Sequence, residues 1–409
     1  MNIAWVSSSP PHLPSTGGFS LIGGNLIPLL ARRHRIDLVS LTRPGDEKHL
    51  EWARRHCASV QSIPVGRPSL SRRVANFASC HLWGRNLLAR DAMENALRAG
   101  LDDRRWDILH VEGGMVAGLI PEKFPLPKVL AVHDAEVLRA RELRRCKLPW
   151  RARLNYLARG WHEPRYERLV YPRFDQCVMV AERDAAFNRE LIPQARFCSI
   201  PNGIDCNYFC PVEVRKEPAG MVFHGNLAYA PNVEAACEFA ERILPLLRRD
   251  HPDATFHMVG ATPESRIRDL GSRPGIRLSA NLPDLRSALC AASVYVCPLQ
   301  HGSGMKNKIL EAMASQLPIV CYEGAIAGID CTPGQHVVVA RGPADFAAKV
   351  STLLRFPERA AQTARMGRAF VIENYSWEVS AAAYEQIYAR LAIRRQAAAE
   401  VCVGTHLGQ

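Results

Sequence analysis

Residues 298–320 have the types and spacing that best suggest chemistry in this chain. A glycine-rich turn leads into an expected helix with two lysines in its first turn. A helix start presents unpaired backbone N–H groups and the positive end of the helix dipole, so it suits an anion. Lysines there are disfavoured by the same dipole unless a strong anion binds. The predicted phosphate-binding residues are Gly302, Ser303, Gly304, Lys306 and Lys308.

One carboxylate, Glu311, follows on an otherwise apolar part of the same segment. A carboxylate repels phosphate but accepts hydrogen bonds from hydroxyl groups. Phosphates at one end and hydroxyls further along describe a nucleoside diphosphate carrying a sugar. The alternative interpretation is a helix with a solvated basic first turn and an exposed Glu311. The segment alone does not distinguish the two, so the rest of the sequence is needed.

Length and composition set the class of protein. The 409 residues are enough for two domains, and 47% hydrophobic with 22% charged residues is ordinary for a globular protein. The net charge of +12 predicts a polyanionic partner: diphosphate ligands, an anionic membrane surface or nucleic acid. The sequence has no run of roughly 18 apolar residues and no basic start of a signal peptide, so we expect a cytoplasmic protein. The 13 cysteines have neither zinc-site spacing nor a disulfide framework, which predicts reduced thiols.

Short apolar runs alternate with helical stretches, and the pattern restarts after a turn at 201–203 and a linker to about 218. Such alternation predicts parallel sheets in two doubly wound α/β domains facing a cleft. An amphipathic helix at 377–391 has no following strand and is expected to cross back to the first domain. Expected strands lie at 2–7, 35–41, 58–65, 107–111, 128–132, 175–180, 197–200, 220–224, 254–259, 277–279, 294–297, 317–321 and 336–339.

The expected domains follow from this pattern. Residues 1–205 are expected to form an N-terminal Rossmann-like domain and residues 206–375 a C-terminal one. Residues 376–391 form the helix that packs on the first domain, and residues 392–409 form a loose tail.

Three motifs on these halves resemble a known family. They are Ile-Pro-Asn-Gly-Ile-Asp at 200–205, Phe-His-Gly-Asn-Leu at 223–227 and Leu-Glu-Ala-Met-Ala at 310–314. The spaced set is similar to GT-B glycosyltransferases, and more narrowly to family 4, the group 1 family of retaining transferases. The resemblance covers residues 1–391, and it implies that the first domain binds the acceptor and the second binds the nucleotide-sugar donor. It implies a hexosyltransferase-like enzyme that moves a sugar from a nucleotide-diphosphate sugar to an acceptor, with retention, without a metal and without a further cofactor.

The resemblance also implies roles for individual residues. Glu311 matches the glutamate that binds the donor ribose, and His133 matches a catalytic-region histidine near the transferred sugar. Asp134 is expected to cap the helix that follows. Donor-binding backbone is implied at Gly17, Gly18, Gly225 and Asn226.

The chain departs from the family pattern at two places. Relatives carry an arginine and a lysine in and just after the turn at 225, where this chain has Asn226, Ala228, Tyr229 and Ala230. Relatives also carry a glutamate eight positions before the ribose glutamate, where this chain has Ser303. We therefore hypothesise that Lys306, together with Lys308, supplies the missing positive charge. Glu112, after an expected strand, is predicted to bind the acceptor, with a solvated carboxylate as the alternative.

A basic segment at 139–173 interleaves arginines with Trp150, Tyr156 and Trp161. A solvated face and contact with an anionic membrane are the favoured readings, because no nucleic-acid module accompanies the segment. The acceptor is then a saccharide, a lipid-linked sugar or a small molecule, and the protein sits in the cytoplasm or on the inner face of the membrane. The arginines are Arg139, Arg141, Arg144, Arg145, Arg151, Arg153, Arg159, Arg165, Arg168 and Arg173.

Other functions fit the same fold. An NAD-type oxidoreductase is disfavoured because the turn after the first strand lacks Gly-x-Gly-x-x-Gly. A nucleotide-sugar epimerase of GT-B type should show its own acid and base carboxylates. A non-catalytic sugar-nucleotide binder would explain the missing first glutamate. Among transferases, synthesis of surface polysaccharide or glycoconjugates is the favoured setting, and glycosylation of natural products is the alternative.

Overall fold

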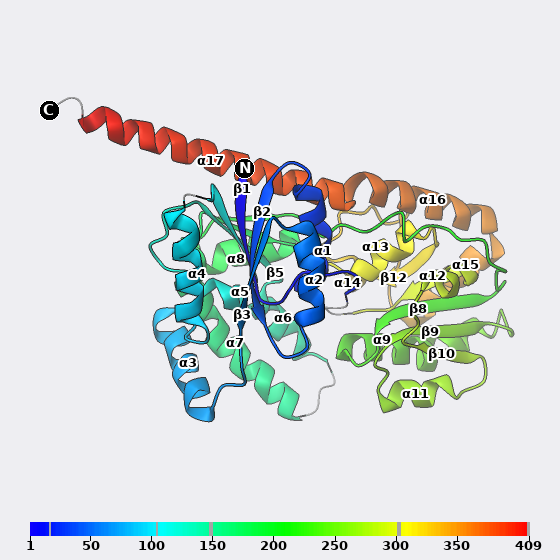
Figure 1. The fold of residues 1–409 in the computed structure, drawn as a ribbon. Coiled ribbons are helices and arrows are strands. Elements are labelled where there is room, and N and C mark those ends of the chain that lie inside the picture. Colours follow the sequence, from blue (N-terminus) through cyan, green and yellow to red (C-terminus); the bar gives the residue numbers. More distant parts are fainter. Residues whose placement is uncertain (16–17, 104, 147–149, 301–303, 407–409) are drawn as a thin grey trace. The chain divides into compact units, whose positions relative to one another are not determined.

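The computed structural model describes residues 1–15, 18–103, 105–146, 150–300 and 304–406 (Figure 1). The chain forms two compact units, each built on one parallel sheet. The first unit contains Met1–Val137, Arg159–Pro201 and Trp377–Gln409, and the second contains Leu138–Ala158 and Asn202–Ser376. The segment 138–158 therefore groups with the second unit, although the sequence places it within the first domain.

The first sheet has the strand order β3-β2-β1-β4-β5-β6-β7, and its pairs are parallel. In β1, Ile3 to Val6 are all fully buried, as expected for a central strand covered on both faces. The strands are β1 (Asn2–Ser7), β2 (Arg35–Thr42), β3 (Ser59–Pro64), β4 (Ile108–Glu112), β5 (Lys128–His133), β6 (Gln176–Met179) and β7 (Phe197–Ser199).

Helices cover both faces of this sheet (Figure 1). The helices of this part of the chain are α1 (Gly18–Leu30), α2 (Glu47–His56), α3 (Leu70–Trp83), α4 (Arg90–Asp102), α5 (Gly114–Ala117), α6 (Glu136–Leu143), α7 (Trp150–Val170), the short 3₁₀ helix at Tyr171–Arg173 and α8 (Glu182–Leu191). Most of α6 and the part of α7 up to Ala158 belong to the second unit.

The last helix, α17 (Trp377–His406), packs on the first unit. Its buried side chains recur at helical spacing and join the cluster around Ile22 and Leu26 of α1. The Tyr388 hydroxyl lies 2.8 Å from His110 Nδ1 in the sheet below. Residues 392–406, for which the sequence predicted a loose tail, continue α17 as helix. The buried stripe is Trp377, Ala381, Tyr384, Tyr388 and Leu391.

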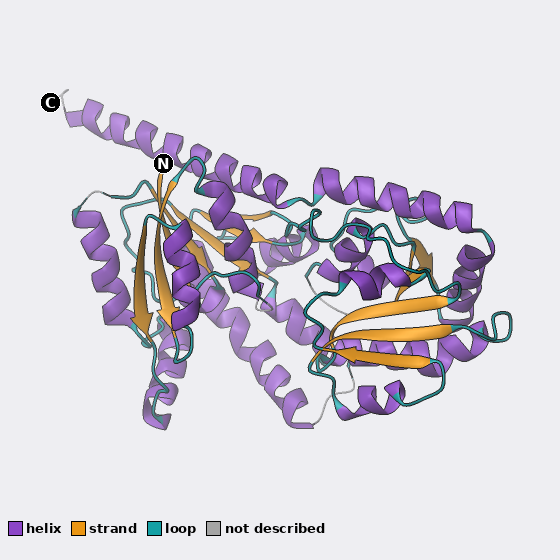
Figure 2. Ribbon diagram, turned by 45° about the vertical axis from the view of Figure 1, so that its right-hand side comes forward, coloured by secondary structure: helices purple, strands orange, loops and turns teal. Residues whose placement is uncertain are grey.

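The second sheet has the order β10-β9-β8-β11-β12-β13, again with parallel pairs. Figure 2 shows strands of this sheet with helices on either side. Residues 221–223 of β8 are fully buried and form the centre of its core. The strands are β8 (Gly220–Asn226), β9 (Thr255–Ala261), β10 (Ile276–Ala280), β11 (Val294–Cys297), β12 (Ile319–Tyr322) and β13 (Val338–Ala340).

The helices of the second unit follow its strands. One stretch, Phe239–Ile243, is a π-helical turn between α9 and α10. The helices are α9 (Ala230–Glu238), α10 (Leu244–Leu247), α11 (Ser265–Gly271), α12 (Arg286–Ala291), α13 (Asn307–Ala314), α14 (Glu323–Ile326), α15 (Pro343–Arg355) and α16 (Pro357–Asn374).

Candidate functional site

Each sheet reverses its strand order once, between β1 and β4 in the first unit and between β8 and β11 in the second. Doubly wound sheets bind ligands beyond the carboxyl ends of the strands at this reversal. In the second unit, β8 ends there with His224, Gly225 and Asn226. Helix α13 contributes Lys308 and Glu311 to the same place, because both side chains contact residues of β8. These five residues form the candidate donor site.

Lys308 reaches the turn after β8. Its Nζ donates to Asn232 Oδ1 at 2.5 Å and lies 4.5 Å from the centre of the Phe223 ring. An ammonium has three donors, so hydrogen bonds to a ligand remain open to it. Burial lowers the pKa of Lys308 to about 8, and Cys297 and Glu311 oppose that effect. A positive charge held with this little compensation is a suitable partner for a diphosphate.

Gly225 is required at this position. Its φ of 149° lies in a region that side chains rarely adopt. A Cβ there would lie 2.7 Å from Lys308 Nζ and 2.9 Å from Asn232 Nδ2. Any larger residue would therefore displace the ammonium. Asn226 builds the turn, since its side-chain oxygen accepts from Ala228 N and its carbonyl accepts from Asn232. We therefore expect Asn226 to serve a donor through its backbone.

Glu311 is fixed by a histidine that the sequence analysis did not assign. Its Oε2 lies 2.5 Å from His224 Nε2, and the His224 side chain is buried. A His224 tautomer with its proton on Nε2 donates a hydrogen bond to this carboxylate oxygen. The Glu311 side chain is 21% exposed, which leaves it accessible to hydroxyl groups. The prediction of a hydroxyl-binding carboxylate stays a prediction, and the structure supplies the group that orients it.

The two lysines of the sequence motif differ in position. Helix α13 begins at Asn307, so Lys306 is its N-cap residue and Lys308 lies in its first turn. The Lys306 ammonium turns back to the carbonyl oxygen of Gly304, at 3.1 Å. Lys308 is the lysine whose ammonium lies beside Gly225 in the turn after β8. Gly304 is buried with a φ of 65°, while Gly302 and Ser303 lie outside the described residues.

The first unit brings a second polar cluster together at its own strand reversal. His133 ends β5 with a φ of 74°, and its ring packs 4.4 Å from the Phe19 ring. Glu112 ends β4, and its Oε1 lies 3.4 Å from His133 Nε2. Its Oε2 accepts from Trp5 Nε1 at 3.0 Å. The His133 side chain is 14% exposed, whereas that of Glu112 is 1% exposed.

The expectation that Glu112 binds the acceptor does not fit this burial. Burial raises the pKa of its carboxyl, and the contacts with His133 and Trp5 lower it. Oε2 is bonded to Trp5, and Oε1 lies against His133, so the side chain is packed between protein groups. Gly18 is the exposed first residue of α1, with open space where a side chain would be, and Gly17 lies outside the described residues.

The arginine-rich segment is partly structural. Arg165 donates to the His81 carbonyl, Arg168 to the Leu191 carbonyl, and Arg173 to the carbonyls of Trp83 and Gly84. These contacts tie the segment around α7 to neighbouring elements of the first unit. They account for three of the arginines without a ligand.

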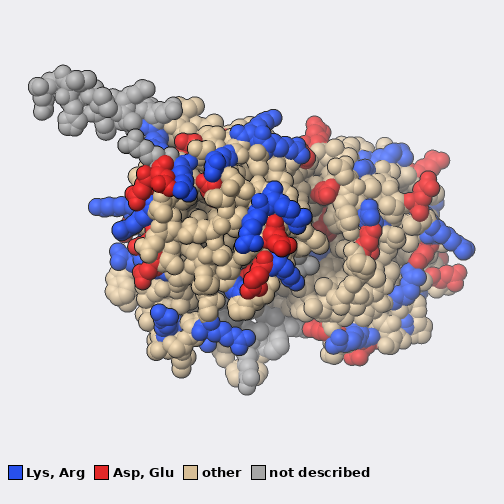
Figure 3. Space-filling model, viewed as in Figure 1, with Lys and Arg blue, Asp and Glu red and all other residues tan. Residues whose placement is uncertain are grey.

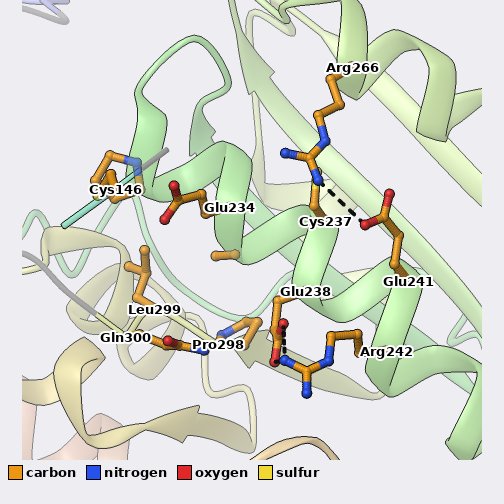
Figure 4. A pocket seen from close by; sticks show the side chains of 12 residues that line it. Cys146, Glu234, Cys237, Glu238, Glu241, Arg242, Arg266, Pro298, Leu299 and Gln300 are labelled. Atoms are coloured by element: carbon orange, nitrogen blue, oxygen red, sulfur yellow. Dashed lines mark hydrogen bonds and ion pairs between the residues drawn. The ribbon is translucent and has the colours of Figure 1, made fainter. Parts of the chain in front are cut away.

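A separate cavity of 290 Å³ lies along α9 (Figure 4). It is lined by ion-paired side chains: Arg242 contacts Glu238 at 3.1 Å, and Arg266 contacts Glu241 at 3.4 Å. Burial raises the pKa of the Cys146 thiol to about 12, so it stays protonated at neutral pH. Because carboxylates already compensate these cations, the cavity suits an anionic donor less well than the Lys308 site.

Comparisons with known proteins agree with this architecture. Residues 16–208 match Glycosyltransferase Family 4, and residues 218–355 match Glycosyl transferases group 1. The chain is 27% identical over 338 residues to glycogen synthase of Mycobacterium tuberculosis, which is 73% of this chain and 74% of that protein.

Two solved structures show the same fold. Sucrose-phosphate synthase from Thermosynechococcus elongatus has a TM-score of 0.66 at 15% identity, over 95% of this chain and 98% of that chain. HepE from Anabaena, in complex with UDP and glucose, has a TM-score of 0.64 at 12% identity, over 95% and 100%. The fold is therefore of the GT-B type. The chain belongs to glycosyltransferase family 4, the group 1 family, and is a glycosyltransferase.

Proposed function

We propose that this glycosyltransferase takes its sugar from a nucleoside-diphosphate sugar bound at the end of β8. The observation that carries the proposal is the pairing of two groups on α13. The partly buried cation Lys308 lies beside Gly225, and the histidine-held carboxylate Glu311 follows three residues later. A pyrophosphate needs the first group and ribose hydroxyls suit the second.

The chemistry required of the donor site is stabilisation of the departing diphosphate. As the glycosidic bond breaks, negative charge grows on the leaving nucleotide, and a fixed cation stabilises that charge. Lys308 and the first amides of α13 supply the positive potential. Because this charge comes from the chain itself, we propose transfer without a metal or a further cofactor. Retention of the anomeric configuration is proposed by analogy with the family.

His133 is proposed to contact the transferred sugar during the reaction. Glu112, buried behind it, acts as a positioning residue that holds the imidazole and balances a positive charge on it. Phe19 packs against the same ring and restricts its rotation.

The first donors to test are UDP-sugars, because HepE has been seen with UDP and glucose and the pneumococcal transferase GtfA with UDP and GlcNAc.

Surface polysaccharide or glycoconjugate synthesis is the proposed setting. An uncharacterised Klebsiella pneumoniae protein from a cps region is 20% identical over 163 residues. We propose a cytoplasmic location, and the free thiols of the described cysteines support it, because that compartment keeps thiols reduced. No helix among the described residues is long and apolar enough to span a bilayer.

A thermal-shift panel tests the donor assignment. Specific binding of one nucleoside-diphosphate sugar at 100 times its Kd stabilises the fold by about 2.7 kcal/mol, so a selective rise identifies base and sugar together. Release of the nucleoside diphosphate, measured with and without candidate acceptors, then separates a transferase from a protein that only binds the donor. A uniform response to every nucleotide, or none at all, would contradict the proposal.

A further inference from the structure

Helix α3 buries two polar side chains and exposes a stripe of apolar ones. Asn76 and Ser79 are buried, and the Asn76 side chain accepts from the backbone N–H of Leu87. The outward stripe consists of Leu70, Val74 and Phe77, which are 74%, 61% and 51% exposed. A surface helix normally has the opposite arrangement. Its inversion indicates that the outer face meets something other than water.

The exposed stripe borders an apolar groove. Side chains of α3 form one wall of a cavity of 570 Å³. Leu88, Met115 and Tyr166 contribute to the rest of its lining. The polar side chains among its described lining residues are Arg73, Asn76, His81, His162 and Glu163. Scattered exposed hydrophobic residues are common, but a continuous stripe beside an apolar groove marks an interaction site. We call this surface the α3 face.

The charge around the α3 face has one sign over a long stretch of sequence. Residues 52–90 contain seven arginines and no aspartate or glutamate. Arg67, Arg72 and Arg73 flank the apolar stripe, and all three are exposed. Figure 3 shows basic and uncharged side chains at the lower left, where α3 lies in Figure 1. Cations beside an apolar stripe complement an anionic surface with an apolar interior.

The helix is held firmly enough to act as a docking element. Ser69 caps its N-terminus by accepting from Arg72 N, and Gly84 ends it in the left-handed conformation. Arg165 of α7 donates to the His81 carbonyl near its C-terminus. The stripe is therefore presented by an ordered helix and need not fold on contact.

We propose that the α3 face docks on the surface of an anionic lipid bilayer. Leu70, Val74 and Phe77 enter the boundary between headgroups and acyl chains, the groove receives an acyl chain, and the arginines contact lipid phosphates. The proposal rests on the first unit alone and does not depend on the donor chemistry of the second. This surface differs from the segment 139–173, for which the sequence suggested membrane contact. Three arginines of that segment bind backbone carbonyls within the first unit.

Sedimentation with vesicles tests the proposal in the full-length protein. The vesicles contain phosphatidylcholine with about a third phosphatidylglycerol, and pure phosphatidylcholine is the comparison. We expect binding to the anionic vesicles that weakens as salt rises from low to physiological concentration. Val74→Ser with Phe77→Ser should lower the partition coefficient at least about tenfold. Arg72→Gln with Arg73→Gln should lower it about fivefold per arginine.

Phe356→Ser is the matched control, because Phe356 is an exposed phenylalanine in the second unit. It should bind vesicles as the wild type does. Donor-induced thermal shifts should be unchanged in all these variants, so a loss of vesicle binding is distinct from a failure of the donor site or of folding. Two results would overturn the proposal: no vesicle binding by the wild type at low salt, or a wild-type dimer in sedimentation velocity that Phe77→Ser dissociates.

Discussion

Replacing Lys308 by methionine removes the ammonium from the candidate donor site while keeping most of its volume. A hydrogen bond to a charged group contributes about 1.5–3 kcal/mol, so the Kd of the donor should rise about 10- to 150-fold. Lys349→Met is the control, because Lys349 is a lysine of the same unit that pairs with Asp345 on the helix surface. That variant should bind donor as the wild type does.

The lowered pKa of Lys308 gives the same prediction a pH dependence. With a pKa of about 8, the side chain is about 90% charged at pH 7 and about 10% charged at pH 9. If the diphosphate requires the charged form, donor affinity falls about tenfold per pH unit above 8. A lysine with an ordinary pKa would keep the affinity constant to about pH 10.

Titration calorimetry measures directly how many protons the protein takes up when the donor binds. At pH 8 the wild type should take up about half a proton when a UDP-sugar binds, because the diphosphate raises the pKa of Lys308 again. Titrations in two buffers of different ionisation enthalpy give this number, and Lys308→Met should show none of it. The reasoning is refuted if wild-type affinity stays constant from pH 7 to 9.5 and Lys308→Met binds donor normally.

The stability of the donor-free protein also depends on the protonation of Lys308. The unfolded chain binds the Lys308 proton more tightly than the folded chain, so folding releases protons between pH 8 and 10.5 and stability rises with pH there. From pH 7 to 9.5, the wild type should gain roughly 2 kcal/mol in free energy of unfolding relative to Lys308→Met. Urea unfolding of both proteins at pH 7 and 9.5 checks whether the free energy of unfolding rises with pH as predicted.

Three further substitutions test other contacts. Glu311→Ala should raise the Kd of a UDP-sugar about 10- to 100-fold but leave pyrophosphate binding nearly unchanged in competition assays, and equal losses for both ligands would argue against a ribose contact. Glu112→Gln should lower kcat and move the acidic limb of the pH–rate profile with the donor Kd unchanged, whereas an unaltered profile would leave Glu112 without a role at His133. Tyr388→Phe should cost about 1–3 kcal/mol in urea unfolding by leaving His110 unpaired, and a smaller loss would show that water replaces the hydroxyl.

The strands and the C-terminal helix could be predicted from the sequence because their signals are local. Apolar runs such as residues 3–6 identify buried strands, and the spacing of Tyr384 and Tyr388 identifies the buried side of α17. The end of α17 could not be predicted, because residues after 391 show no apolar periodicity. The structure nevertheless continues the helix to His406.

Side-chain partners in the sites could not be predicted in the same way. Whether Lys306 or Lys308 meets the β8 turn depends on where α13 begins, and a shift of one residue turns a side chain by about 100°. His224 was visible in the motif at 223–227, but its contact with Glu311 spans 87 positions in the sequence. Glu112 looked accessible at a strand end, and only the packing of Trp5 shows its burial.

A crystal structure of the protein with a bound UDP-sugar tests the central claim most directly. The account predicts pyrophosphate oxygens within hydrogen-bond distance of Lys308 Nζ and a ribose hydroxyl on Glu311, with His224 still holding the other carboxylate oxygen. A nucleotide bound in the cavity along α9, with Lys308 still bonded only to Asn232, would contradict it.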